Sequence, residues 1–480
     1  MNYRFILYIL GALLLIEGCL MITPVAAELI FGEHDLSAIL YSSALAFLAG
    51  GIFCYFNRNC SKDIGKHEGF IIVSAVWIVY ASFGSLPFVF SGYIPSFTDA
   101  FFETMSGFTT TGYTILADVE ALPHGLLFWR ALMQFTGGIG ILVLCIAVLP
   151  IFGVGSMAIY QAETSAASAG EKISPRIKDT AKHIAGIYTV LTAACILLYL
   201  PDMNIFDSVC HALSTTATGG FSTKNESLGA FPVYSQSVAT LFMFLGSAPF
   251  ILFFYTWKRE YQKITRNDEL RFIIIMILLS STVICTGLLF SNYQPAQAIH
   301  ESLFNVVNVV STSGFAINDY KMWTLPMWFI VFLLTFVGGC AGSTVGGLKM
   351  VRFLLLLRMI PVQFKKMIHP NAIIHVKLNG HNVTEERMYR TLAFLMIFLC
   401  VYVAGVFVLM FCGFDFISSA TTSIACLSTL GPGLELTYPV SSFAEISTAG
   451  KWVCSFLMLL GRLELYSVLI LFSIAFWRKK

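Results

Sequence analysis

Four short stretches of hydroxyl residues, each ending in a glycine, are the part of this chain best suited to binding an ion. Aligned on the glycine, the four cores are Thr110-Thr111-Gly112, Ala217-Thr218-Gly219, Thr312-Ser313-Gly314 and Thr429-Leu430-Gly431. None contains an acidic side chain, whereas a calcium site would favour carboxylates. Backbone carbonyls, turned inward where glycine relieves the steric limit on φ, can replace the hydration shell of a monovalent cation. Each core is therefore predicted to form one quarter of a cation selectivity filter.

Each core ends a moderately apolar segment that is too short to cross a bilayer. The segments are FETMSGFTTTGY, VCHALSTTATGG, FNVVNVVSTSGF and TTSIACLSTLGP. About a dozen residues make a half-membrane helix of roughly 15–18 Å, whose C-terminal end carries partial negative charge. Four such ends around one axis favour a cation at the centre, and the irregular backbone that follows is then buried in protein. Acids near the helix starts complement the helix dipoles, and a second role in concentrating cations at the outer mouth stays open: Asp99, Asp207, Glu301 and Asp415.

The composition identifies an integral membrane protein. Of the 480 residues, 57% are hydrophobic and 12% charged, and the mean hydropathy is +0.78. The net charge of +2 gives no signal for nucleic acid, and the twelve cysteines are scattered without a paired metal-site spacing. Ten runs are long enough to cross the hydrocarbon layer: 4–31, 37–57, 69–92, 127–152, 183–202, 234–257, 272–291, 326–357, 391–412 and 452–477.

The distribution of basic residues predicts the orientation of these spans. With both termini in the cytoplasm, most of the 29 Lys and Arg residues fall in connections on one face, as expected for cytoplasmic loops. The four short segments then lie in outer connections. The predicted fold is an all-α polytopic membrane protein with ten transmembrane helices, in which four span–pore helix–span repeats surround one pore.

The repeats divide the chain into six parts. They are two N-terminal transmembrane helices (1–66), pore repeat one (67–157), a cytoplasmic linker (158–182), pore repeat two (183–262), pore repeat three with a glycine-rich loop (263–369) and pore repeat four (370–480). Fourfold repetition around an axis favours a channel-like pathway. A secondary transporter, the alternative that stays open, would instead use discontinuous helices around a midplane site.

Two features at membrane depth are unusual for a spanning helix. The eighth run contains a cluster of small residues, which predicts a broken or bent helix unless they serve close helix packing: Gly338, Gly339, Gly342, Ser343, Thr344, Gly346 and Gly347. Arg462 lies inside the last run, where a charge is costly and usually faces a cavity or an ionic partner. Glu464 is too near in sequence to share its helix face. Arg130, near the outer end of its run, is interpreted as a structural anchor behind the first pore helix.

The repeats together with TTTGY, TATGGFST, TLGPG and the ending MLLGRLELYSVLILF resemble the Trk/Ktr/HKT superfamily of potassium transporters, in particular its bacterial TrkH-type uptake subunits. The resemblance covers essentially the whole chain. It implies potassium as the transported ion, a location in the bacterial inner membrane, a gating loop formed by the glycine cluster, and Arg462 as an electrostatic barrier below the filter. The fourth core departs from the pattern, since Leu430 precedes its glycine and Pro432 follows it.

The resemblance also implies partners. Proteins of this kind form homodimers and sit on a cytosolic RCK-type, nucleotide-binding regulatory subunit similar to TrkA. The chain itself contains no strand–GxGxxG–helix fingerprint, so no covalent cofactor is expected and nucleotide would act only through that partner. An intramembrane enzyme is not expected, because no HExxH and no paired intramembrane Asp is present and no catalytic constellation stands out. The functional alternative to a channel-like pathway is a symporter that couples potassium to protons or sodium.

Overall fold

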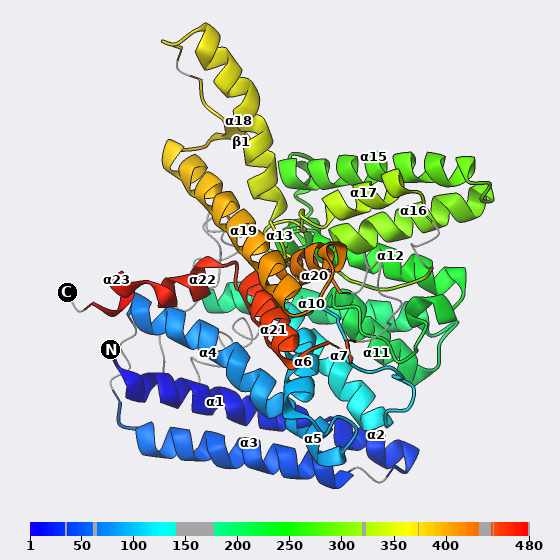
Figure 1. Ribbon diagram of the computed structural model, residues 1–480, viewed down its shortest axis with the longest axis vertical. Helices are drawn as coiled ribbons and strands as arrows, with labels where there is room; N and C mark the ends of the chain where they lie inside the picture. The colour runs from blue at the N-terminus through cyan, green and yellow to red at the C-terminus, as the bar shows by residue number, and fades with distance from the viewer. Residues whose placement is uncertain are drawn as a thin grey trace.

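The computed structural model describes residues 1–33, 36–60, 65–140, 177–318, 323–372, 374–431, 443–444 and 446–478. Most of the linker expected at 158–182, the end of the predicted span 127–152, and Pro432 lie outside these residues. The described part is helical, and its β-structure is one short hairpin, β1 (Lys377–Leu378) paired with β2 (His381–Asn382), plus one isolated bridge between Val337 and Leu348. The all-α prediction is confirmed for this part of the chain (Figure 1).

The first half of the chain begins with a helical hairpin and continues into the first two predicted repeats. Its helices are α1 (Tyr3–Ile22), α2 (Pro24–Phe31), α3 (Leu36–Asn57), α4 (Lys66–Gly84), α5 (Leu86–Ser91), α6 (Phe97–Phe108), α7 (His124–Ile139), α10 (Ile177–Tyr199), α11 (Ile205–Thr216), the 3₁₀ turn η2 (Ser227–Ala230), α12 (Val233–Ser247), α13 (Phe250–Trp257) and α14 (Tyr261–Thr265). Figure 1 shows α1 and α3 side by side. Gly11 and Gly50 face each other there, so the two backbones approach closely.

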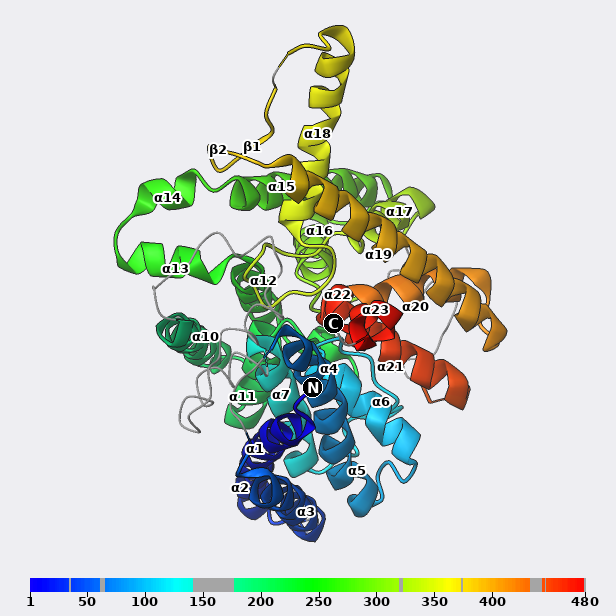
Figure 2. The same cartoon turned by 90° about the vertical axis from the view of Figure 1, so that its left-hand side faces the viewer.

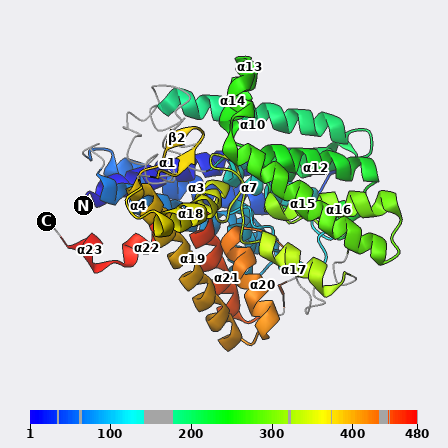
Figure 3. The same ribbon diagram turned by 90° about the horizontal axis from the view of Figure 1, so that it is seen from above.

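The second half contains the remaining helices. They are α15 (Asp268–Phe290), α16 (Pro295–Val310), α17 (Leu325–Leu334), α18 (Met350–Ile368), α19 (Glu385–Phe411), α20 (Phe416–Ser428), α21 (Thr448–Arg462), α22 (Tyr466–Leu469), η4 (Ile470–Phe472) and α23 (Ile474–Trp477). Figure 2 shows α18 projecting from the body with the β-hairpin near its base. Figure 3 shows α19, α20 and α21 packed side by side.

Six helices in the described residues are long and apolar enough to cross a membrane, or eight if each of two bent pairs counts as one span. The other two predicted spans have no continuous helix of that length within the described residues. The span 127–152 is described only as far as Gly140, and α7 ends at Ile139. In 326–357, α17 ends at Leu334 and α18 begins at Met350, so the break predicted from the glycines is confirmed.

The two bent pairs were expected to be continuous spans. Between α12 and α13 the chain turns by 94°, directly before Pro249, which has no N–H for a continuing helix. Between α21 and α22 it turns by 111°, where Glu464 and Leu465 adopt left-handed φ angles of 52° and 61°. Neither of these two residues is a glycine, so the sequence carried no sign of the second bend.

Two hydrophobic cores hold these elements. One joins α1 and α4 to the short helix α6, to α7, and to α19–α21. The other joins α10–α12 to α15–α17. The first and fourth predicted repeats therefore share one core and the second and third share the other, which brings the four short helices α6, α11, α16 and α20 together between them.

Candidate ion pathway

The four short helices have defined starts and buried bodies. Ser96 accepts a hydrogen bond from the Asp99 N–H at the start of α6, Asn204 does the same for Asp207 in α11, and Asp415 accepts from Ile417 and Ser418 in α20. Such caps satisfy N–H groups that have no partner in the helix. α16 begins instead at Pro295, a residue suited to a first helical position.

All four helices end in the same way. The residue after the last turn is a threonine in the left-handed region: Thr110 (φ 58°), Thr218 (φ 53°), Thr312 (φ 50°) and Thr429 (φ 51°). The N–H of the next residue then bonds back to a carbonyl five residues earlier, at 2.9–3.0 Å, in each of the pairs Thr111–Ser106, Gly219–Ser214, Ser313–Asn308 and Leu430–Ala425. This pattern satisfies carbonyls at the helix end and directs the following backbone away from the helix axis.

The repeated backbone corrects the sequence alignment of the second core by one residue. Thr218, and not Ala217, has the left-handed conformation of Thr110, and Gly220 (φ 81°) matches Gly112 (φ 89°). The equivalent core is therefore Thr218-Gly219-Gly220. Two adjacent glycines left the sequence alignment ambiguous, whereas the hydrogen-bonded helix end has one register.

The segments that follow the four helix ends meet in a closed ring, formed by the residues around Gly112, Gly220, Gly314 and Gly431. A Cβ placed on Gly314 would lie 2.8 Å from the Gly431 nitrogen, and one on Gly431 would lie 2.6 Å from the Thr111 carbonyl oxygen. A Cβ on Gly112 would be 3.4 Å from the Gly219 carbonyl carbon, and one on Gly220 would be 3.0 Å from the carbonyl carbon of Gly314. Each segment thus touches the next around a common centre. A cavity of about 210 Å³ borders three of the segments on the side toward which the chain leaves the ring.

The irregular segment between α17 and α18 packs against this ring from the other side. Thr344 Oγ1 lies 3.3 Å from Thr218 Oγ1, and the Gly346 N–H donates to Thr312 Oγ1 at 3.3 Å. A Cβ on Gly346 would be 3.0 Å from the Cβ of Thr429. The sequence-predicted glycine loop therefore contacts the left-handed threonines of three segments.

Arg462 supplies the contact to the fourth segment. Its guanidinium donates to Thr110 Oγ1 at 3.2 Å and to the Thr344 carbonyl oxygen at 2.7 Å. It also donates to the carbonyl oxygens of Gly137 (2.5 Å) and Gly138 (3.1 Å), near the C-terminal end of α7. The arginine thus lies between the ring and the loop, and its positive charge is stabilised by carbonyls at a helix C-terminus.

Comparisons with a family model, with related sequences and with a solved structure all match this chain over most or all of its length. The family model described as "TrkH: Cation transport protein" matches residues 36–479. The chain is 37% identical to the Trk system potassium uptake protein TrkH of Salmonella typhimurium and 35% identical to that of Halomonas elongata, and each alignment covers all of both chains. The crystal structure of the potassium transporter TrkH from Vibrio parahaemolyticus is similar with a TM-score of 0.89 and 32% identity, over 100% of both chains. The chain belongs to the TrkH family.

The TrkH family consists of transport proteins, which confirms the prediction that this chain is not an enzyme. Membership also confirms the resemblance drawn from the four cores and the C-terminal motif. The histidines have structural partners where the structure describes their bonds; His211, for example, is buried between the Asp207 carbonyl oxygen and Ser222 Oγ. No group of three or more His, Cys, Asp or Glu side chains that could hold a metal ion occurs among the described residues.

Buried polar side chains hold the ring in this TrkH-family protein, and the sequence analysis missed most of them. Gln134 donates to the Gly219 carbonyl oxygen at 2.7 Å and accepts from Ser214 Oγ (2.6 Å) and the Phe221 N–H (3.1 Å). Asn308 donates to the Phe315 carbonyl oxygen at 2.7 Å and accepts from its N–H at 2.9 Å. Each amide holds the non-helical segment that leaves a core. A buried amide at membrane depth was the signal available in the sequence.

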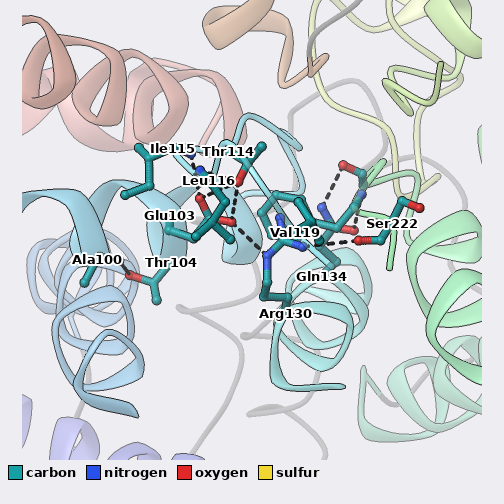
Figure 4. Close-up of polar contacts among 12 residues, drawn as sticks. Ala100, Glu103, Thr104, Thr114, Ile115, Leu116, Val119, Arg130, Gln134 and Ser222 are labelled. Atoms are coloured by element: carbon teal, nitrogen blue, oxygen red, sulfur yellow. Dashed lines mark hydrogen bonds and ion pairs between the residues drawn. The ribbon is translucent and has the colours of Figure 1, made fainter. Parts of the chain in front are cut away.

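Glu103 is the corresponding clamp of the first segment (Figure 4). It is fully buried, accepts from Thr114 Oγ1 and the Ile115 N–H at 2.9–3.0 Å, and pairs with Arg130 Nε at 2.9 Å. Arg130 also donates to the Ser222 carbonyl oxygen at 3.2 Å, so Glu103 and Arg130 together join the segment after the first core to the segment after the second. Arg130 thus anchors α6, the helix that the sequence analysis interpreted as the first pore helix.

The four acids predicted near the helix starts are engaged within the protein, but Glu301 is the seventh residue of α16 and lies beyond its first turn. Asp99 pairs with Lys451 at 2.7 Å, Asp207 accepts from Thr223 at 2.6 Å, and Glu301 accepts from Asn318 at 2.5 Å. Asp415 caps α20. Asp415 therefore caps its helix, Asp207 and Glu301 hold the segments that follow the cores, and Asp99 joins α6 to α21. Within the glycine cluster, Gly342 and Ser343 lie away from the ring: a Cβ on Gly342 meets open space, and Ser343 bonds to the Cys340 carbonyl oxygen.

Proposed function

We propose that this protein takes up potassium across the bacterial inner membrane through a filter lined by backbone carbonyls. The filter residues are those of the four cores in the structural register: Thr110-Thr111-Gly112, Thr218-Gly219-Gly220, Thr312-Ser313-Gly314 and Thr429-Leu430-Gly431. Support comes from family membership and from relatives that are named potassium uptake proteins. The cores contain no acidic side chain, so carbonyl and hydroxyl oxygens are the available ligands.

The observation that carries the proposal is the shared contact surface of ring, loop and arginine. The loop or Arg462 contacts the left-handed threonine of each of the four cores. An ion that leaves the filter on this side meets the loop and a guanidinium charge. We infer that the structure corresponds to a closed pathway, in which Gly338, Gly339, Gly346 and Gly347 let the loop pack tightly and move when the pathway opens.

The wider architecture follows from the same proposal. The chain would cross the membrane ten times with both termini in the cytoplasm, and pore repeats 67–157, 183–262, 263–369 and 370–480 would surround one pathway. The names of the relatives refer to a Trk system, which supports assembly with other subunits. We propose a homodimer on a cytosolic RCK-type, TrkA-like regulatory subunit, with nucleotide acting through that subunit.

The second candidate is a symporter that couples potassium to protons or sodium. A coupled transporter needs a site that is exposed alternately to the two sides, commonly between two inverted halves. Four equivalent helix ends around one centre favour the channel-like pathway instead, since every core contributes the same backbone geometry.

The test is ion flux in proteoliposomes that hold only this protein, with potassium compared to sodium. We expect potassium-preferring flux that rises in Arg462→Ala, because the barrier charge is removed, and loses its preference in Gly220→Ser, because a side chain enters the ring. Arg390→Ala is the control, since Arg390 lies on an exposed face of α19. Flux that requires a second ion, or a preference unchanged by Gly220→Ser, would favour the symporter.

A further inference from the structure

The bend between α21 and α22 determines where Arg462 points. Arg462 is the last residue of α21, and the chain then turns by 111° through Glu464 and Leu465. Both residues have left-handed φ angles, which residues with a Cβ adopt at an energetic cost. Such a bend persists only where surrounding contacts hold it.

One of these contacts is an ion pair between Glu464 and α18, the helix that follows the glycine loop. Arg352 Nη2 lies 2.5 Å from Glu464 Oε2, and the two side chains are only 9% and 17% exposed. Arg352 is the third residue of α18 and comes three positions after Lys349, where the loop ends. The guanidinium also stacks over the Phe394 ring of α19 at 3.7 Å. The pair therefore connects the end of the loop directly to the bend that aims Arg462.

Glu464 lies near several basic side chains. Lys349 interacts electrostatically with Glu464, Arg352 and Arg462. Its ammonium group also donates to the Val345 carbonyl oxygen within the loop. Three cations thus gather below the ring with Glu464 as the acid among them. Removing Glu464 leaves the buried cations without an acid among them, and removing Arg352 leaves the largely buried Glu464 carboxylate without its hydrogen-bonded ion-pair partner; both changes are unfavourable.

We propose that Arg352 and Glu464 are positioning residues whose ion pair holds the glycine loop and Arg462 together in the closed pathway. The inference rests on the proposed function of the loop and Arg462 as a barrier. In the arrangement described, a movement of α18 that displaces the loop also pulls on the bend, so both parts of the barrier leave the ring together. The ion pair would couple the movement of the glycine loop to that of Arg462, so that both block the pathway or leave it together.

Two other roles make different predictions. If the two charges only changed the electric potential felt by a passing ion, Arg352→Gln would raise potassium flux and Glu464→Gln would lower it. If the pair only supported folding, the variants would yield less folded protein with unchanged flux per folded molecule. A connection that holds the closed state requires both neutral variants to change flux in the same direction, upward.

The experiment measures potassium flux per folded protein in proteoliposomes for Arg352→Gln, Glu464→Gln and the charge exchange Arg352→Glu with Glu464→Arg. We expect each single variant to raise flux at least about tenfold, since loss of a buried pair from one state shifts a two-state equilibrium by that order. The exchange should return flux toward the native value. Arg390→Gln, which breaks an exposed ion pair with Glu386 on α19, is the matched control and should change nothing.

Arg462→Ala in the same series separates the two proposals. If Arg462→Ala raises flux but the pair variants do not, or change it in opposite directions, the positioning role is wrong and the barrier stands. If Arg462→Ala leaves flux unchanged, the barrier is wrong and the positioning role falls with it. Should the neutral variants fail to fold, Arg352→Lys decides, because it keeps the charge but not the guanidinium fork: raised flux supports the pair and native flux overturns it.

Discussion

Alanine substitutions at Gly314 and at Gly92 can distinguish the effect of backbone strain from the effect of steric crowding in the ring. Their φ angles are 81° and 82°, so alanine is unfavourable in the backbone of both. A Cβ at Gly92 meets nothing within 4 Å, whereas a Cβ at Gly314 would lie 2.8 Å from the nitrogen and 2.9 Å from the Cα of Gly431. Gly314→Ala and Gly92→Ala therefore differ in one respect, the contact with the neighbouring segment.

The expected magnitudes follow from this difference. Both substitutions cost about 1–2 kcal/mol for placing an L-residue in the left-handed region. At position 314 the new Cβ must also move away from the nitrogen and Cα of Gly431 by roughly 0.5 Å or more to reach an ordinary contact distance. That displacement falls on segments three and four of the ring, which carry the proposed carbonyl ligands. We expect Gly314→Ala to lose most of the potassium preference and Gly92→Ala to retain it, with comparable losses of stability from strain alone.

The assay combines two measurements on the same preparations. Thermal unfolding in detergent reports the stability of each variant, and proteoliposome flux with potassium or sodium reports the preference. Both variants can be made in the Arg462→Ala background, so that flux is large enough to compare. Equal loss of preference in the two variants would refute the reasoning, because it would attribute the effect to backbone strain; full preference in both would remove the ring from ion selection.

Two further predictions concern the clamps and the ion itself. Glu103→Gln should lower the free energy of unfolding by about 3–5 kcal/mol, because Arg130 stays buried without its counter-charge. Thermal unfolding should show this loss. A smaller loss in the double variant Glu103→Gln with Arg130→Met would support the pairing. If the ring binds potassium, replacing choline by potassium at constant ionic strength should raise the unfolding temperature, by the equivalent of about 2.7 kcal/mol at a hundred times the dissociation constant. The shift should persist in Gly92→Ala and disappear in Gly314→Ala, and a shift that survives in both would point to a site elsewhere.

The sequence was sufficient for the repeated plan of the four helix ends that form the proposed ion pathway, because that plan rests on local physical chemistry. A segment too short to span, ended by hydroxyls and glycine, has few stable arrangements in a membrane. The same holds for the glycine cluster between Gly338 and Gly347, where helix propensity alone predicts the observed break. Arg462 could be singled out because a charge at that depth needs partners.

The partners themselves could not be read from the sequence. Arg462 bonds to backbone carbonyls of Gly137, Gly138 and Thr344, and every residue has such a carbonyl, so its partners carried no side-chain signal. Glu464 pairs with Arg352, 112 positions away, and not with the nearby arginine. Long-range pairing depends on how whole helices pack, which local spacing does not encode.

The sequence by itself determined the membrane character, the four short helices with their threonine and glycine ends, and the interruption of the eighth run. These follow from hydropathy, helix length and backbone preference, which are properties of neighbouring residues. The tertiary structure decided the register of the second core, where adjacent Gly219 and Gly220 are equivalent in sequence and are distinguished by the hydrogen bond from the Gly219 N–H to Ser214 and by the positive φ of Gly220. It also decided the bend after Arg462, because left-handed conformations at Glu464 and Leu465 are unfavourable locally and exist through contacts with distant helices.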